Sequence, residues 1–182
     1  GVSLPFRGGD VDYTKLALFL GDEYVLQEFG RSANSFTASA MKKIKQAIES
    51  GRAKPADAME LMKHNLLELA HRAIAKNEGF GKYTSINPKG NYIEFRSAGG
   101  TNYFEDLDKL KNTLLRYAQA MAVAGDPAAY RREYYKKLYK LISPKEGDPA
   151  IDLFARYAAG ELSSEQLKAQ WAEKALEKEK AQ

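Results

Sequence analysis

One stretch of the sequence, residues 82–97, has the pattern of β-strands, and the remainder has the pattern of helices. Two short runs with alternating character flank the turn sequence NPKGN at 87–91, where Pro and Gly suit the backbone angles of a tight turn. In the second run Ile93 and Phe95 fall on one face, and Tyr92, Glu94 and Arg96 fall on the other. We therefore predict an α+β fold, mostly α-helical, with six to seven helices around a small antiparallel β-hairpin at about residues 82–97.

Two strands alone are only marginally stable, so the hairpin must lie on the helices or pair with another chain. A short additional strand at residues 2–4 is an alternative source of pairing, and an unpaired edge would favour association with a partner. For the helices, the periodicity predicts segments at about 12–29, 39–49, 55–77, 105–124, 127–142 and 149–159, with a last one after 163.

The expected helix ends follow from residues that suit helix termini. Asp12 is the expected N-cap of the first helix, and Gly21 interrupts that segment, so two helices meeting near Gly21 would also fit. The dipeptide Asp-Pro at 126–127 and again at 148–149 is expected to open a helix. Ser163 with Gln166 is a candidate capping box for the last helix.

Apolar spacing predicts which side of each later helix faces the core. The last helix is expected to dock through Leu162, Leu167, Trp171, Ala175 and Leu176. The helix at 105–124 is expected to bury an apolar face made of Leu107, Leu110, Leu114, Ala118, Met121 and Ala122.

The segment 130–140 interleaves tyrosines with lysines and arginines. This pattern is compatible with stacking on nucleic-acid bases while the cations neutralise phosphates. It equally describes an amphipathic helix whose tyrosines pack inward while the basic stems reach outward. The spacing of Tyr130, Tyr134, Leu138 and Leu141 favours the packed interpretation and leaves nucleic-acid binding as the less favoured one.

Composition limits the class of protein. A chain of 182 residues is expected to form one domain, with an N-terminal arm at 1–11, a globular part at 12–172 and a charged helical tail at 173–182. The net charge of +4 is mild, and the lack of cysteine excludes disulfides and thiolate chemistry. No apolar run reaches the roughly 20 residues of a membrane span, and no signal peptide is expected. The expected location is the cytoplasm, or a virion if the chain is phage-encoded.

Two groups of polar residues have spacings that suit chemistry. His64, Glu68 and His71 share one face of a predicted helix, which is a weak metal-site signal and is more simply a polar stripe. Glu94 and Arg96 project from the same strand face. A carboxylate is a hard oxygen ligand suited to Mg²⁺, and a guanidinium presents a planar fork to a phosphate or carboxylate. The alternative is an exposed charged face without a role.

The hairpin also carries a family resemblance. The sequence YTSIN at 83–87, followed by YIEFRSAGG at 92–100, resembles the Glu-Phe-Arg core of the amidoligases, which are often phage- or plasmid-encoded and have a glutamine-synthetase-like fold. The segments 13–31 and 108–117, the Asp-Pro at 126–127 and RREYYKKLY at 131–139 also look similar to that family. The resemblance covers about residues 10–160.

The resemblance implies an ATP- and Mg²⁺-dependent ligase that joins an amine to a carboxylate, often of glutamate or a peptide. It implies that Glu94 is a metal ligand and that Arg96 contacts phosphate or substrate, so these two residues form the expected catalytic pair. Lys82 and Asn87, which lie nearby in the hairpin, are expected to contact the cofactor together with Arg96.

The chain departs from that family upstream of the hairpin. Members similar to it have a strand with a Gly-Val-His-x-x-Val-like motif and, before it, a strand with acidic metal ligands, whereas this chain starts GVSLPF. We therefore expect either the C-terminal portion of a larger amidoligase-like enzyme, completed elsewhere, or a chain that lacks the activity. The alternative to an amidoligase-like enzyme is a non-catalytic phage structural or accessory protein that binds a protein partner or nucleic acid.

Overall fold

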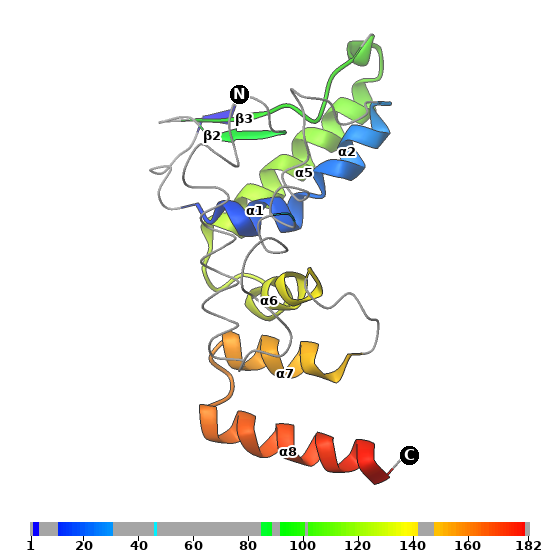
Figure 1. Ribbon diagram of the computed structural model, residues 1–182. Helices are drawn as coiled ribbons and strands as arrows, with labels where there is room; N and C mark the ends of the chain where they lie inside the picture. The colour runs from blue at the N-terminus through cyan, green and yellow to red at the C-terminus, as the bar shows by residue number, and fades with distance from the viewer. Residues whose placement is uncertain are drawn as a thin grey trace. The chain divides into compact units, whose positions relative to one another are not determined.

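The computed structural model describes residues 2–3, 11–30, 46, 85–88, 92–100, 102–141 and 148–180 (Figure 1). Within these ranges the chain has six α-helices, one short 3₁₀ helix and three β-strands, which confirms the mostly helical α+β fold. The chain divides into two compact units. The first holds the strands and helices α1, α2 and α5, and the second holds α6, α7 and α8. Apart from Gln46, the predicted helices at 39–49 and 55–77 lie outside the described residues.

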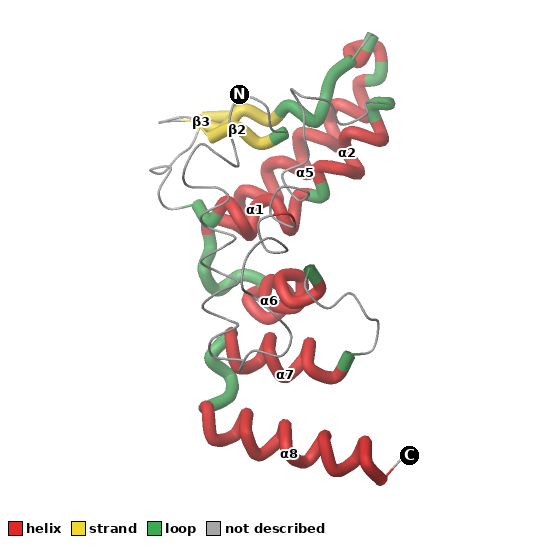
Figure 2. Tube along the Cα trace, in the orientation of Figure 1, coloured by secondary structure: helices red, strands yellow, loops and turns green. Residues whose placement is uncertain are grey.

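The sheet of the first unit has three antiparallel strands, β1 (Val2–Ser3), β2 (Ile86–Pro88) and β3 (Tyr92–Phe95). Their order is β1-β3-β2, so β3 is central. Figure 2 shows β2 and β3 side by side. Ile86 pairs with Phe95, and Asn87 pairs with Glu94. The additional N-terminal strand is therefore confirmed at residues 2–3, and the antiparallel pair is confirmed within the predicted range. The prediction that Asn87 and Pro88 belong to the turn is wrong, because both lie in β2 and pair with β3.

The apolar face of this sheet packs on helix α5 (Leu107–Gly125). Ile86 and Ile93 are fully buried, and the ring of Phe95 stacks on that of Tyr117, with centroids 4.2 Å apart and an angle of 9° between the planes. Packing against a helix is one of the ways in which a small sheet becomes stable. The expectation that the hairpin lies on a helix is therefore confirmed, and the helix is α5.

Helices α1 (Tyr13–Leu20) and α2 (Asp22–Glu28) meet at Gly21, whose φ of 66° lies in the left-handed region. Asp12 caps α1 by accepting a hydrogen bond from the Lys15 backbone at 3.0 Å, as predicted. The same segment is tied to the end of α5, since the Asp12 N–H donates to the Ala124 carbonyl at 3.1 Å and Lys15 Nζ donates to the Asp126 carbonyl at 2.7 Å. These bonds fix which side of α5 faces α1.

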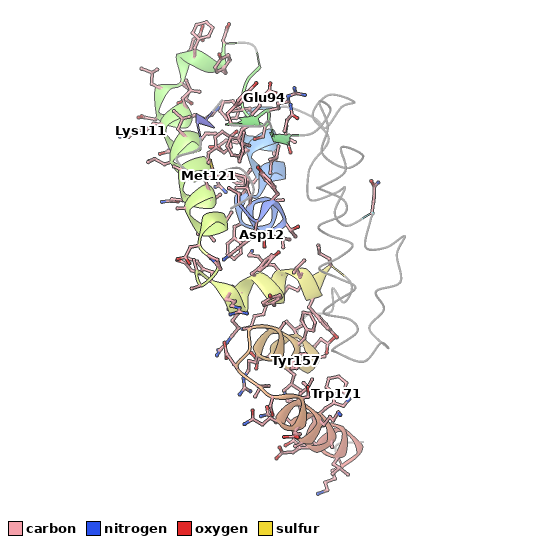
Figure 3. All side chains as sticks on the ribbon, turned by 90° about the vertical axis from the view of Figure 1, so that its left-hand side faces the viewer. Asp12, Glu94, Lys111, Met121, Tyr157 and Trp171 are labelled. Carbon is pink, nitrogen blue, oxygen red and sulfur yellow. The ribbon has the colours of Figure 1, made fainter. Side chains whose placement is uncertain are left out.

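The predicted core face of α5 is largely wrong. Leu107 is 72% exposed, and Leu114, Ala118 and Ala122 are also exposed, whereas Met121 is buried as expected. Figure 3 shows Met121 on the side of α5 toward α1 and Lys111 on the outer side. The helix carries two apolar stripes, and the contacts to α1 and the sheet select the less obvious one. The buried residues are Thr113, Tyr117, Ala120, Met121 and Ala124.

Helix α6 (Arg131–Lys140) starts later than expected. The Asp126 carboxylate accepts a hydrogen bond from the Ala128 N–H at 2.9 Å, but this bond closes a turn and does not open the helix. Tyr130 then adopts a left-handed φ of 48°, so regular helical geometry begins only after it. The prediction that Asp-Pro at 126–127 opens this helix is therefore wrong by four residues.

The core of the second unit is aromatic. Tyr134, Tyr135 and Tyr139 of α6 are buried, and Tyr135 and Tyr139 contact the ring of Phe154 on helix α7 (Pro149–Ala158), with centroids 6.4 and 5.2 Å apart. Tyr130, which the spacing placed in the core, is exposed. Three of these tyrosines therefore pack inward, which is the interpretation that the spacing favoured. Their buried rings are not available for stacking on bases.

Helices α7 and α8 (Ser164–Lys180) begin at the predicted caps. Asp148 accepts a hydrogen bond from the Ala150 N–H at 2.9 Å. Ser163 and Gln166 form the reciprocal capping box, with bonds of 2.9 and 3.2 Å between each side chain and the other backbone N–H. Leu162 and Leu167 are buried as predicted, in a cluster with Leu153 of α7, whereas Trp171 and Leu176 farther along α8 are exposed.

Across the described part of the chain, no helix combines the length and the apolar character needed to cross a membrane.

The Thr113 hydroxyl gives a first stability prediction. Thr113 is 3% exposed, and its Oγ1 has no hydrogen-bond partner among the residues that the structure describes. Thr113→Val removes a buried polar group at nearly constant shape, so we expect the free energy of unfolding to rise by about 1 kcal/mol. Urea unfolding followed by circular dichroism measures this. The matched substitution Thr14→Val, at a buried threonine that makes further interactions, is expected to destabilise the chain. A loss of stability in Thr113→Val would contradict the prediction.

Tyr139 gives a pH-dependent prediction. Burial raises the pKa of Tyr139 to about 12, with a further contribution from the charge of Asp148, whereas an unfolded tyrosine has a pKa of about 10. The folded state therefore holds the phenol proton more tightly, and the stability from this group is complete below pH about 10 and is lost as the pH rises toward 12. Tyr139→Phe should reduce the loss of stability between pH 8 and 11 in urea unfolding, by on the order of 1 kcal/mol.

The control is Tyr130→Phe at an exposed tyrosine, which should retain the pH dependence of the wild-type chain. If Tyr139→Phe loses as much stability as the wild type over this pH range, Tyr139 does not carry the effect.

Candidate functional site

The polar face of the sheet brings together three of the predicted site residues. Glu94 Oε2 accepts a hydrogen bond from Asn87 Nδ2 at 2.8 Å and another from Arg96 Nη2 at 2.8 Å. Asn87 lies on β2, Glu94 lies on β3 and Arg96 directly follows β3. One carboxylate oxygen therefore joins residues from two strands, and we call these three residues the polar cluster.

The strand register explains this arrangement. Asn87 and Glu94 are direct partners in the β2–β3 pair, so their side chains project from the same face. Arg96 is two residues beyond Glu94 and shares that face because side chains alternate along a strand. The Arg96 N–H donates to the Ser85 carbonyl at 2.7 Å, which continues the pairing past β3 and holds the Arg96 backbone.

The polar cluster is not an open charged surface. Asn87 is 3% exposed, and the exposed fractions of the Arg96 and Glu94 side chains are 21% and 37%. Partial burial strengthens the attraction between the Glu94 carboxylate and the Arg96 guanidinium, since screening by water is reduced. It also restricts their side-chain motion. The alternative of a fully solvated Glu/Arg face does not describe this sheet.

Tyr117 connects the polar cluster to α5. Its hydroxyl lies 2.7 Å from Ser97 Oγ and accepts a hydrogen bond from the Ala98 N–H at 3.2 Å. Ser97 is fully buried, and it immediately follows Arg96. Ser97 and Tyr117 were not predicted as site residues from the sequence. Their contact joins positions twenty residues apart, and no local sequence pattern indicates it.

The remaining predicted site residues are not brought into this arrangement. Lys82, expected to contact the cofactor, lies outside the described residues, as does the helical group His64, Glu68 and His71. Tyr92 is partly exposed on the strand that carries Glu94. Where the chain is described, no three His, Asp or Glu side chains form a group that could hold a metal ion.

The side chains of the polar cluster are of the kinds that bind anions and cations. A guanidinium carries five N–H donors in one plane, so an arginine oriented by a carboxylate can also bind a phosphate or a second carboxylate. Glu94 is an oxygen ligand of the kind Mg²⁺ prefers, and carboxylates that bind metals are themselves oriented by hydrogen bonds such as those from Asn87 and Arg96. Mg²⁺ that accompanies ATP often uses one or two protein carboxylates, with phosphates and water as its other ligands. Glu94 fits that limited requirement.

Comparison with known proteins found no match among family models, curated proteins or solved structures.

The connection through Tyr117 can be tested by removing its hydroxyl. Tyr117→Phe keeps the ring stacked on Phe95 but leaves buried Ser97 and the Ala98 N–H without this partner. We expect the free energy of unfolding to fall by about 1–3 kcal/mol in urea titrations. The double variant Tyr117→Phe with Ser97→Ala removes both members of the hydroxyl pair and should recover part of that loss. Unchanged stability in Tyr117→Phe would show that this hydroxyl does not hold the sheet to α5.

Proposed function

We propose that the chain is an amidoligase-like protein that takes part in the ATP- and Mg²⁺-dependent joining of an amine to a carboxylate. The observation that supports the proposal is the convergence of Asn87 and Arg96 on one oxygen of Glu94 in a partly buried part of the sheet. The resemblance of YIEFRSAGG at 92–100 to the amidoligase core points to the same residues.

The roles of the residues follow from their chemistry. Arg96 binds the negatively charged reactant, either a phosphate of ATP or the substrate carboxylate, because its planar fork matches both groups. Glu94 orients Arg96 and offers an oxygen to Mg²⁺. Asn87 holds the Glu94 carboxylate from the neighbouring strand, and Lys82 is proposed as an additional phosphate contact.

Bound ATP would supply the phosphoryl group that activates the carboxylate toward the amine. The contribution of this chain's residues is to position and neutralise charged reactants, and such fixed charges stabilise a developing negative charge without having to reorganise. The proposal thus requires that Glu94 and Arg96 act as a pair.

A second candidate is a non-catalytic interaction protein of a phage, structural or accessory, that acts by binding another chain. The observation that favours it is the exposed apolar surface of α5 and of the 3₁₀ helix η2 (Tyr103–Glu105), where Phe104 is 61% exposed and Leu107 is 72% exposed. Apolar side chains gathered on a surface often mark an interaction site.

The experiment that separates the two is a thermal shift of the full chain with Mg-ATP. At a nucleotide concentration one hundred times the Kd, binding to the folded state adds about 2.7 kcal/mol of stability and should raise the Tm by about 5–10 °C. Glu94→Gln removes the charge of the proposed Mg²⁺ ligand, and Arg96→Ala removes the proposed phosphate contact. Both substitutions should abolish the rise in Tm.

The control is Arg132→Ala, which removes the arginine of another ion pair, that with Glu161 on the surface of the second unit. Its response to Mg-ATP should equal that of the wild-type chain. Lack of a shift in the wild type, or an equal shift in Glu94→Gln, would contradict the proposed nucleotide site and leave the interaction protein as the better description.

A further inference from the structure

The polar face of β3 extends beyond the polar cluster to Tyr92, the first residue of the strand. Side chains alternate along a strand, so Tyr92, Glu94 and Arg96 project from one face at intervals of two residues. The opposite face carries Ile93, which is fully buried, and Phe95, which packs on α5. The three residues therefore form a row on the side of the sheet away from α5.

The ring of Tyr92 is accessible and has no partner in the described part of the chain. Tyr92 is 38% exposed, close to the exposed fraction of the Glu94 side chain. Among the described residues it has no aromatic neighbour in contact, no cation over its ring and no hydrogen bond to its hydroxyl. The other aromatic residue of β3, Phe95, already has its ring stacked on Tyr117. Tyr92 thus offers a free aromatic face next to the polar cluster.

The spacing along the strand sets how far apart the three groups are. A strand rises about 3.3 Å per residue, so about 13 Å of strand separates Tyr92 from Arg96, with Glu94 halfway between them. The Arg96 N–H donates to the Ser85 carbonyl, which keeps the backbone paired as far as Arg96. An aromatic ring, a carboxylate and a guanidinium therefore lie in a line in that order.

This order is also the order of the groups in a magnesium-bound nucleoside triphosphate. The base is at one end, the terminal phosphate is at the other, and Mg²⁺ bridges oxygens of the β- and γ-phosphates. Bases stack on aromatic side chains, carboxylates are ligands of Mg²⁺, and a guanidinium matches the geometry of a phosphate. Each group of the row thus suits the part of the nucleotide that would lie beside it.

We propose that Tyr92 is the base-binding residue of the site, with the nucleotide lying along β3 and its phosphates directed toward Arg96. The inference rests on the proposed function, because the polar cluster must bind the phosphates. It adds a residue that holds the base, and it assigns Arg96 to a phosphate of ATP rather than to the substrate carboxylate.

The test is isothermal titration calorimetry of the full chain with Mg-ATP and with Mg-tripolyphosphate, which has three phosphates but no ribose or base. The wild-type chain should bind Mg-ATP at least about five-fold more tightly, because stacking of a base on an aromatic side chain contributes this much or more. Tyr92→Ala should raise the Kd of Mg-ATP by the same factor and leave the Kd of Mg-tripolyphosphate unchanged. Tyr92→Phe keeps the ring and should retain both wild-type affinities.

The control is Tyr103→Ala, which removes an exposed tyrosine of η2 outside the sheet and should leave both affinities unchanged. Far-UV circular dichroism checks that every variant is folded.

The outcomes separate this inference from the proposed function. Equal affinities of the wild-type chain for the two ligands overturn the role of Tyr92 while the phosphate site stands. The same conclusion follows if Tyr92→Ala binds Mg-ATP as the wild type does, or if it loses affinity for both ligands equally. A wild-type chain that binds neither ligand overturns the proposed nucleotide site and this inference together.

Discussion

The contact between Phe95 and Tyr117 is the one on which the first unit depends. Strands of two to four residues bury too little surface to be stable alone, so the sheet exists because its apolar face rests on α5. The Tyr117 ring supplies apolar area, and its hydroxyl binds the chain directly after Arg96. A single side chain therefore sets both the stability of the sheet and the position at which the polar cluster is held.

The two units place their aromatic side chains differently. In the first unit the stacked pair joins a sheet to a helix, whereas in the second the tyrosines of α6 pack with Phe154 of α7. A tyrosine buries a large apolar ring while its hydroxyl still seeks a polar partner. Lysines and arginines on the same α6 segment remain mostly at the surface, so an alternation that resembled a nucleic-acid surface builds an amphipathic helix.

Features determined by neighbouring residues could be predicted from the sequence. The caps at Asp12 and Asp148, the break at Gly21 and the capping box of Ser163 with Gln166 depend on contacts within three residues, and the structure has all of them. The alternation that separates Ile93 and Phe95 from Glu94 and Arg96 is likewise local. The polar cluster could be predicted for the same reason, since Asn87 and Glu94 are only seven residues apart in the sequence.

Features determined by distant contacts could not be predicted in the same way. The contact between Tyr117 and Ser97 had no local signal in the sequence. The start of α6 depends on the left-handed backbone conformation of Tyr130, which residues other than glycine rarely adopt. For α5, the sequence offers two apolar stripes, and hydrophobicity alone favours the one with three leucines. The bonds from Asp12 and Lys15 to the end of α5, with the Tyr117 stack, select the other stripe. Hydrophobic spacing identifies the apolar stripes of a helix, but long-range hydrogen bonds decide which stripe turns toward the unit's own core and which stays exposed.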